Sequence, residues 1–333
     1  GCSPVFIASQ EGNVGAIRVL AGMGADVNAR DEQGGTPISI AVQNSKLGAI
    51  RALAELGADV NIPLHGGQTP VFFAAQVGSV GGIITLVRHG ADVNIPMNDG
   101  RTPVFIAAQL GHVGAIASLA EHGANVNTPD KDGCSPIFIA SMEGNCGAIR
   151  VLAELGADVN TLSSSGRSPI SAATFDDNVD AIRVLADLGA DLNAPDENGC
   201  TPVGAAAQLR QAGAIRALAE LGADVNIPLH SGQTPVFFAA QEGDVNAITA
   251  LVEHGADVNT PMKDGRTPFF IAAQLGNVGA ITALAGHGAD VNTPDEDGWT
   301  PVFAAAHNGH LDAIRILIGL RADIETGCDN CFS

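Results

Sequence analysis

Residues 100–127 read GRTPVFIAAQLGHVGAIASLAEHGANVN, and the rest of the chain repeats this stretch with variations. Pro103 has the φ angle of a first helical turn, where its missing N–H group needs no partner. Small apolar residues then predict a short helix that Gly111 ends, and the apolar spacing from Val113 onward predicts a second helix. Gly123 stands where a helix C-terminus requires a positive φ. One copy is two short helices and a hairpin-like arm, too small to bury its own apolar face, so copies must stack.

The copies follow one another at a constant period. Proline recurs at one fixed interval (37 − 4 = 33 at each step), without insertion or deletion, at Pro4, Pro37, Pro70, Pro103, Pro136, Pro169, Pro202, Pro235, Pro268 and Pro301. Such a period, with shared Thr-Pro, Ala-Ala and Gly-Ala-Asp-Val-Asn segments, is typical of a solenoid. The sequence resembles the ankyrin-repeat family over ten units and essentially its whole length. The resemblance implies an all-α solenoid of stacked helix-turn-helix units with hairpin-like arms over residues 1–327, and a C-terminal tail at 328–333.

One departure from the family is systematic. Where the family usually has histidine, two residues after the proline, this chain has Phe6, Ser39, Phe72, Phe105, Phe138, Ser171, Gly204, Phe237, Phe270 and Phe303. The hydrogen bonds of that histidine are lost, and we expect most of the phenylalanines to add apolar packing instead.

Composition and the chain start bear on location. Apolar residues make up 46% of the chain and aromatic residues only 4%, which suits helices built on Ala, Val, Ile and Leu. The apolar runs are a few residues long, so we expect no membrane span, and there is no recognisable leader. Because the chain starts at Gly1, inside a unit, we expect a processed or excised piece whose targeting signal is missing. The compartment is therefore unknown from the sequence, and a soluble, cytoplasmic protein is the default expectation.

Acidic residues dominate the charge. The net charge is −20, from 36 acidic against 16 basic residues, which argues against a nucleic-acid partner because phosphate binding needs a basic surface. Many of the acidic residues recur at one repeat position. It holds Asp26, Asp59, Asp92, Asp158, Asp191, Asp224, Asp257, Asp290 and Asp323, with Asn125 in the remaining unit. The resemblance places this position at the base of the arm. Two interpretations stand: a carboxylate that stabilises the turn, and an acidic edge that attracts a basic partner.

Other polar positions favour structural roles. Six arginines share one position in the second helix and are expected to face outward: Arg18, Arg51, Arg150, Arg183, Arg216 and Arg315. The residue before the second helix is expected to be its N-cap; it is Asn13, Ser79, His112, Asn145, Asn178, Asp244, Asn277 or His310 in different units. Four histidines share a position in the last turn of that helix, where they suit the helix dipole: His89, His122, His254 and His287.

No pattern for catalysis or metal binding emerges. Six cysteines give neither a disulfide framework nor a zinc pattern. Cys146 is expected to be a buried small hydrophobe, and Cys328 and Cys331 form a lone C-x-x-C that favours an ordinary tail or a local disulfide over a redox or metal half-site. No Ser-His-Asp set, phosphate-cradling loop or carboxylate pair stands out. We therefore expect no enzyme, no cofactor and no metal.

Variation within the repeat frame indicates where a partner binds. One position at the end of the first helix holds Gln10, Gln43, Gln76, Gln109, Met142, Phe175, Gln208, Gln241, Gln274 and His307. Met142 and Phe175, beside Arg167 and Cys134 on the arms, form a hypothetical apolar hot spot. The alternative is drift of a degenerate sixth unit.

The arm residue before Thr/Ser-Pro varies as well: it is Cys2, Gly35, Gln68, Arg101, Cys134, Arg167, Cys200, Gln233, Arg266 or Trp299. Trp299, the only tryptophan, is either an interface anchor or packs on the next arm.

A second, longer period relates two arm surfaces. Residues 62–94 and 227–259 share 25 of 33 positions. The surfaces are His65, Gln68 and Arg101, and His230, Gln233 and Arg266. We expect them to bind two copies of one partner or two equivalent elements of an assembly.

These patterns predict a non-enzymatic scaffold that binds a protein on the concave face and arm tips of the solenoid, and the net charge favours a basic partner. A permanent structural subunit of a larger complex is the alternative. The expected contact residues are Met142, Phe175, Arg101, Arg167, Gln68, Gln109, Gln208, Gln233, Arg266 and Trp299.

Overall fold

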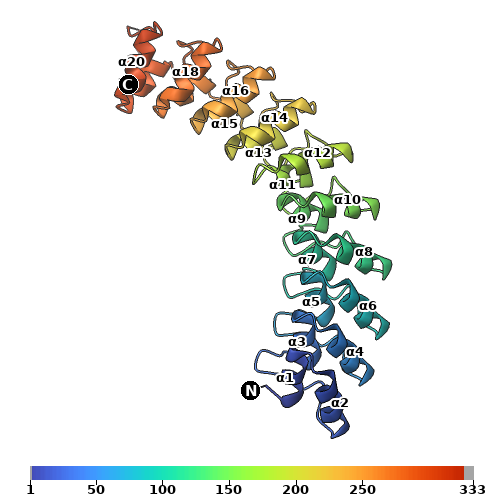
Figure 1. Ribbon diagram of the computed structural model, residues 1–333. Coiled ribbons are helices and arrows are strands. Elements are labelled where there is room, and N and C mark those ends of the chain that lie inside the picture. The colour runs from blue at the N-terminus through green and yellow to red at the C-terminus, as the bar shows by residue number, and fades with distance from the viewer. Residues whose placement is uncertain (1, 326–333) are drawn as a thin grey trace. The chain divides into compact units, whose positions relative to one another are not determined.

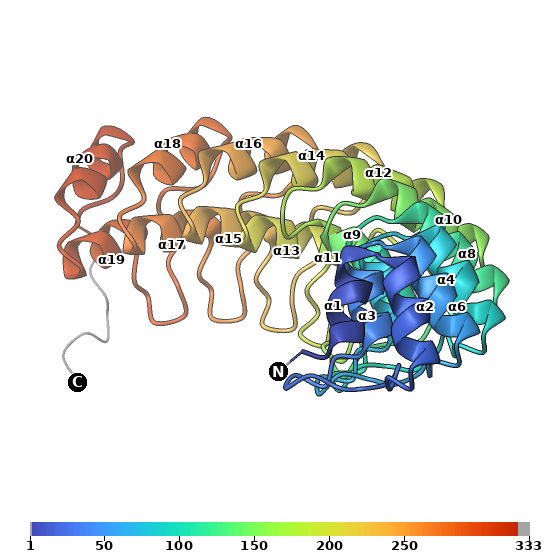
Figure 2. The ribbon, with the colours of Figure 1, turned by 60° about the horizontal axis from the view of Figure 1, so that its bottom comes forward.

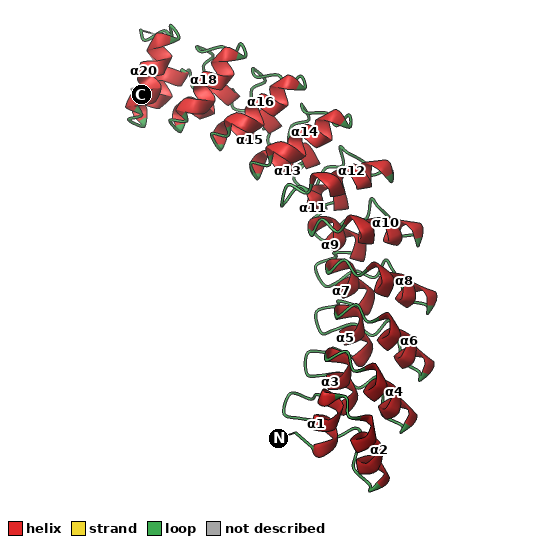
Figure 3. Ribbon diagram, viewed as in Figure 1, coloured by secondary structure: helices red, strands yellow, loops and turns green. Residues whose placement is uncertain are grey.

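The computed structural model describes residues 2–325, and these residues form twenty α-helices and no strand (Figure 3). The chain divides into two compact units, Gly1–Ser164 and Ser165–Ser333. The all-helical architecture of paired helices, which the resemblance to the ankyrin-repeat family implies, is confirmed.

The first unit has ten helices: α1 Pro4–Glu11, α2 Val14–Gly22, α3 Pro37–Gln43, α4 Leu47–Glu55, α5 Pro70–Gln76, α6 Val80–Arg88, α7 Pro103–Gln109, α8 Val113–Glu121, α9 Pro136–Met142 and α10 Cys146–Glu154. The odd-numbered helices lie side by side in one row and the even-numbered helices form a second row (Figure 1). Each repeat thus contributes one helix to each row, and it packs on its neighbours through both.

The second unit has the same two rows. Its helices are α11 Pro169–Ala173, α12 Val179–Asp187, α13 Pro202–Gln208, α14 Ala212–Glu220, α15 Pro235–Gln241, α16 Val245–Glu253, α17 Pro268–Gln274, α18 Val278–Gly286, α19 Pro301–His307 and α20 Leu311–Gly319. The arms that lead from α14 to α15, from α16 to α17 and from α18 to α19 project past the odd-numbered row (Figure 2). The arms and the odd-numbered helices therefore form one face of the unit, and we call it the arm face.

The first helix of a repeat begins at a hydroxyl cap. In α7, the Thr102 hydroxyl accepts a hydrogen bond from the Phe105 amide at 3.3 Å, and Pro103 occupies the first helical position. This cap satisfies an amide that has no partner inside the helix, while the proline has none to satisfy. The same Ser/Thr-Pro start occurs in all ten repeats.

Backbone of positive φ ends the helices, as the glycine pattern predicts. Gly123 has φ 88° and Gly111 has φ 73°. At the position of Gly111 three repeats carry another residue, yet Ser45, Asp177 and Arg210 keep φ values of 56°, 55° and 61°. Packing of the repeat, rather than the residue itself, therefore imposes this conformation, which is strained for residues with a Cβ atom.

The core contains the phenylalanines that replace the family histidine. Six of them are buried: Phe6, Phe72, Phe105, Phe138, Phe237 and Phe270. Phe303, in the last repeat, is half-buried. The second helix of each repeat contributes aliphatic side chains such as Ile116 and Leu119, which have no exposed surface. The expected exchange of histidine for apolar packing is confirmed.

The residues predicted as N-caps of the second helices do stand at the N-cap position, but the capping hydrogen bond expected of them is mostly not made. Among the second helices that the structure describes, only those of Ser79 and Asp244 have a cap side chain that accepts hydrogen bonds from amides in the first turn of its own helix. Asn145 instead points its amide nitrogen backwards along the chain and donates to the carbonyl oxygens of Ala108 and Gln109, at 3.2 and 2.7 Å. Asn277 does the same towards the carbonyl oxygens that end α15. This position therefore ties a repeat to the end of the preceding first helix.

The outer face of the even-numbered row is solvated, as the arginine position predicts. Five of its six arginines are exposed: Arg18, Arg51, Arg150, Arg183 and Arg315. Arg18 reaches Glu55 in the next repeat at 2.5 Å, and Arg183 reaches Glu220 at 2.7 Å. Exposed pairs of this kind contribute little to stability, so these two pairs add little to the fold.

Candidate functional site

The base of the arms is a hydrogen-bonded ladder within each compact unit. The Asp59 amide donates to Asn28 Oδ1 at 2.8 Å, and Asp59 Oδ1 accepts from the Asn61 amide at 2.9 Å. Asn61 Nδ2 then donates to the Gly90 carbonyl oxygen at 2.9 Å. The amide of the aspartate position repeats this bond in both units. The turn-stabilising interpretation of the aspartates is confirmed, and because Asp59 and Asp92 are exposed, the ladder also carries negative charge.

The arm tips are also bonded to one another. Most tips close on themselves, as in the hydrogen bond from the Met97 amide to the Arg101 carbonyl oxygen at 2.8 Å. Neighbouring tips then join, because the Lys131 amide donates to the Asp99 carbonyl oxygen at 3.0 Å and the Glu296 amide donates to that of Asp264 at 3.0 Å. A partner would therefore meet arms that are already fixed, which lowers the entropic cost of binding.

Arg101 and Arg266 occupy equivalent arm tips and hold equivalent ion pairs. Nε of Arg101 donates to Asp99 Oδ2 at 2.8 Å, and Nε of Arg266 donates to Asp264 Oδ2 at 2.6 Å. These hydrogen bonds hold the pKa of Asp99 and of Asp264 below the usual carboxyl value. Each arginine charge is therefore largely compensated within its own arm. Gln68 and Gln233 lie half-buried on the preceding arms of the two units.

Met142 and Phe175 are half-buried, not the exposed pair that the hot-spot hypothesis assumed. The Arg167 guanidinium lies over the Phe175 ring, with Cζ 5.0 Å from the ring centroid, which is a cation–π contact. Met142 belongs to the first compact unit, while Phe175 and Arg167 belong to the second. A shared hot spot formed by these side chains thus stays a hypothesis.

The glutamine position varies in exposure along each unit. Gln208 is exposed, whereas Gln109 is half-buried and its Nε2 donates to Glu143 Oε1 at 3.3 Å. In the second unit, Gln274 Oε1 is buried and accepts no hydrogen bond from any of the described residues, and a buried acceptor without a donor is costly.

Gln274 lines a cavity of about 300 Å³ on the arm face of the second unit. The lining residues are Asp264, Arg266, Phe270, Gln274, Asp295, Glu296, Asp297 and Trp299. The Trp299 ring packs against Phe303, with ring centroids 4.7 Å apart, and against His307 at 5.0 Å. The ring therefore packs on α19 of its own repeat. Both interpretations of Trp299, an interface anchor and packing on the next arm, stay predictions, because most of the arm after α20 lies outside the described residues.

Most of this cavity was not predicted from the sequence. Arg266 and Trp299 were expected contact residues, but Phe270, Gln274 and residues 295–297 were not predicted to share a site with them. The available signal was the acidic run Asp295-Glu296-Asp297 shortly before the lone tryptophan. That these residues meet Asp264 follows only from the stacking of adjacent arms.

Side chains capable of redox or metal chemistry are engaged or dispersed. Among residues 2–325, no group of three or more His, Cys, Asp or Glu side chains is arranged to hold a metal ion. Burial raises the pKa of the Cys134 and Cys200 thiols to about 11, so neither is a ready nucleophile. Cys146 is half-buried, against the expectation that it is buried. Cys328 and Cys331 lie outside the described residues.

The histidines near the ends of second helices form local hydrogen bonds. Nδ1 of His89, His122 and His254 bonds to the carbonyl oxygen four residues earlier, at 2.7–2.8 Å. This agrees with the helix-end role expected for that position. Among residues 2–325, no helix is both long and apolar enough to span a membrane.

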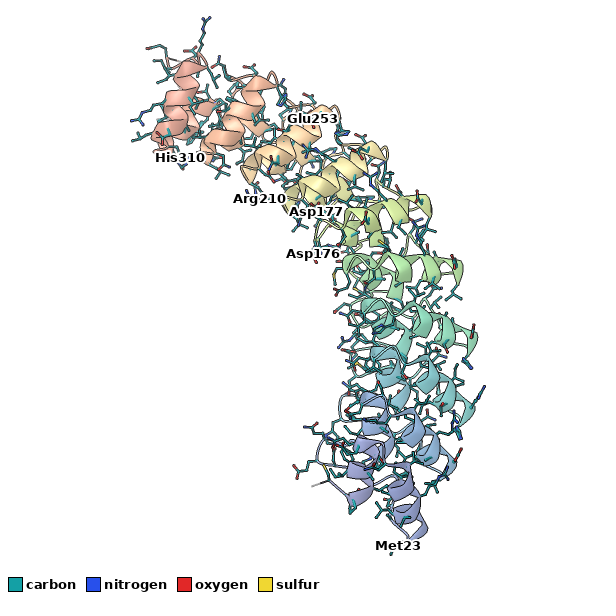
Figure 4. All side chains as sticks on the ribbon, in the orientation of Figure 1. Met23, Asp176, Asp177, Arg210, Glu253 and His310 are labelled. Carbon is teal, nitrogen blue, oxygen red and sulfur yellow. The ribbon has the colours of Figure 1, made fainter. Side chains whose placement is uncertain are left out.

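One apolar side chain is unusually exposed. Met23, at the end of α2, is 82% exposed and projects into solvent (Figure 4).

Two residues with a Cβ atom have a positive φ in consecutive repeats of the second unit. They are Asp177 and Arg210, which are labelled in Figure 4. Asp177 Oδ1 also accepts a hydrogen bond from the Ala214 amide at 2.5 Å, so its carboxylate fixes the next repeat in place.

Comparison with known proteins covers nearly the whole chain. The family described as ankyrin repeats (3 copies) matches residues 5–97, 71–163, 155–228 and 222–295, and the single ankyrin repeat matches residues 297–329. Among solved structures, the ankyrin repeat domain of human ASB11 is similar, with 26% sequence identity and a TM-score of 0.55. That match covers 61% of this chain and 90% of the ASB11 chain. No curated protein sequence matches the chain.

Proposed function

Since the chain belongs to the ankyrin-repeat family, whose repeats generally mediate protein–protein interaction, we propose that it is a non-enzymatic scaffold. Its partner is a protein that binds the arm face of the odd-numbered helices. The observation that carries this proposal is the ladder of arm hydrogen bonds, because it presents a row of fixed side chains at regular spacing. Variable residues, among them Gln68, Arg101, Gln233 and Arg266, occupy the tips of that row.

Charge supports a basic partner. The chain carries a net charge of −20, and the exposed aspartates of the ladder place part of that charge along the arm face. A surface of one sign increases the rate of encounter with a partner of the opposite sign, and the increase falls with ionic strength. We therefore expect association that slows markedly as salt is added.

The test is capture of the native partner followed by mapping with surface variants. The paired variant Gln68→Ala and Gln233→Ala changes the arm tips, while Arg51→Ala with Arg150→Ala changes only the outer face as a matched control. Binding weakened by the arm pair and unchanged by the outer pair supports the proposal. Loss of binding through the outer pair alone contradicts it.

Two finer hypotheses use the same captured partner. A stoichiometry of two partner elements per chain supports equivalent sites at Arg101 and Arg266, and one element per chain counts against them. The double variant Met142→Ala and Phe175→Ala tests the hot-spot hypothesis, which fails if the dissociation constant is unchanged.

A permanent subunit of a larger assembly is the second candidate. Large apolar side chains are exposed on α2 and α20, including Met23 at 82% and Leu311 at 65%. Apolar surface of this kind is commoner in obligate interfaces than in transient ones. Under this alternative, the partner resists salt washes and elutes with the chain at fixed stoichiometry.

A further inference from the structure

We propose that the cavity at Trp299 binds one arginine side chain of the partner protein. This inference rests on the proposed function and adds to it the place and the chemistry of a contact. The cavity lies wholly in the second unit, between the arm of Asp264 and Arg266 and the arm of Asp295 to Trp299. Its volume of about 300 Å³ is at the lower limit of ligand sites, which suits a single long side chain better than a helix.

The charge of the cavity selects a cation. Its lining contains four carboxylates and one guanidinium. Asp264 is engaged with Arg266, and Asp295 Oδ1 accepts the Asp297 and Trp299 amides at 3.1 and 2.8 Å, so these two carboxylates serve the arms themselves. Four carboxylates against one guanidinium leave an excess of negative charge at the cavity, and among the four the Glu296 side chain is exposed.

Trp299 supplies an aromatic surface held in place. Its contacts with Phe303 and His307 fix the ring on α19, while the half-buried side chain still lines the cavity. A guanidinium is planar and weakly hydrated, so it stacks on an aromatic face more readily than an ammonium does. The cavity thus combines a rigid aromatic wall with carboxylates.

Gln274 contributes to the wall of the cavity rather than to the choice of ligand. Its side chain lines the cavity, but its Oε1 has almost no exposed surface, so a ligand in the cavity does not reach that oxygen. The preference for a guanidinium therefore rests on the carboxylates and on Trp299.

The first unit has mostly the same residues at the equivalent positions, but it lacks the two that favour a cation, Glu296 and Trp299. The equivalent positions, five repeats earlier in the chain, hold Asp99, Arg101, Phe105, Gln109, Asp130 and Asp132. Lys131 replaces Glu296, and Cys134 replaces Trp299. The arginine site therefore belongs to the second unit alone.

Intrinsic fluorescence gives a direct test, because Trp299 is the only tryptophan and the chain has no tyrosine. The whole chain is titrated with a capped Gly-Arg-Gly-Arg-Gly peptide, and in parallel with the Lys and Glu peptides of the same length. We expect a saturable change in emission with the Arg peptide, a weaker response to the Lys peptide and none to the Glu peptide. Equal responses to the Arg and Glu peptides, or no saturable response, would overturn the proposal.

Two substitutions distinguish binding of the peptide in the cavity from its attraction to the net charge of the chain. Glu296→Lys installs the residue of the equivalent position in the first unit, and Glu55→Lys makes the same change of net charge on the outer face. We expect the dissociation constant of the Arg peptide to rise about fivefold for Glu296→Lys and to stay within about twofold for Glu55→Lys. Equal weakening by both variants would show attraction to net charge alone and would overturn the site.

A labelled peptide read by fluorescence anisotropy makes the tryptophan itself testable. Trp299→Ala should weaken the Arg peptide by roughly fivefold, while Trp299→Phe should keep part of the affinity. Unchanged affinity in Trp299→Ala would overturn the site. If the site fails while the arm variants still abolish capture of the native partner, the proposed scaffold function stands. Capture lost only through outer-face variants contradicts that function, whatever the peptide does.

Discussion

Replacing Asn277 by alanine should destabilise the second unit by about 2 kcal/mol, the net worth of two hydrogen bonds between repeats. Asn277 Nδ2 donates to the carbonyl oxygens of Ala240 and Gln241 at 3.0 and 2.8 Å. Each hydrogen bond contributes a net free energy of about 0.5–1.5 kcal/mol, and the site is only half-buried, so water replaces part of the loss. The cost arises between repeats, because both acceptors lie in the preceding repeat.

The assay is urea unfolding followed by circular dichroism, together with native-state hydrogen exchange. Repeat arrays do not always unfold in one step, so exchange is needed to assign the loss to a location. We expect faster exchange for amides of α15 to α18, and little change in α1 to α8. Asn145→Ala should behave like Asn277→Ala in its own unit, since Asn145 also donates to two carbonyl oxygens of the preceding repeat.

Asn13→Ala is the matched control. Asn13 stands at the same repeat position, and its side chain makes no capping hydrogen bond to its own helix. We expect its replacement to change the free energy of unfolding by less than about 0.5 kcal/mol. Equal losses for Asn13→Ala and Asn277→Ala would refute the inter-repeat role and restore the N-cap interpretation, which assigns both residues the same function.

Three other predictions concern backbone, charge and thiols. Ser45→Gly should raise the free energy of unfolding by roughly 0.5–1 kcal/mol in urea titrations, because φ is 56° there; a loss would contradict the strain. The side-chain carboxyl of Asp99 should titrate in NMR below 3.8, because its Arg101 hydrogen bond lowers the folded-state pKa. That pair stabilises the fold fully above about pH 3.8 and is lost as pH falls through the lower folded pKa, so a midpoint at or above 3.8 would contradict it. In a variant with Cys328→Ser and Cys331→Ser, a thiol reagent at pH 8 should label exposed Cys2 well before buried Cys200, whose pKa is raised to about 11; equal rates would count against this.

Features that recur in every repeat were predictable from the sequence. The proline of each first helix, the positive φ of Gly123 and the burial of Phe105 each follow from local geometry and apolar pattern. Because the same local pattern recurs in each repeat, a correct description of one repeat also describes the others. The hydrogen-bonded ladder at the base of the arms was also predictable from the sequence, because its aspartates recur at one position.

Features that depend on contact between repeats were not predictable in the same way. Asparagine suits an N-cap and an inter-repeat donor equally well, so the residue type at Asn145 could not decide which group it bonds. The degree of exposure of Met142 and Phe175 depends on neighbours such as Arg167, whose guanidinium lies over the Phe175 ring. The cavity at Trp299 is lined by residues of two neighbouring arms, so no single repeat reveals it.

The sequence separation of the hydrogen bonds between repeats allows the number of repeats in the array to change. The ladder bond from Asp59 to Asn28 spans 31 residues, that from Asn61 to Gly90 spans 29, and those from Asn145 span 36 and 37. Each of them joins adjacent repeats, and none skips one. A cut that removes exactly one repeat length inside a unit would bring equivalent donors and acceptors back together at the new junction. Shorter and longer relatives of this chain could therefore arise by gain or loss of whole repeats without a new kind of contact.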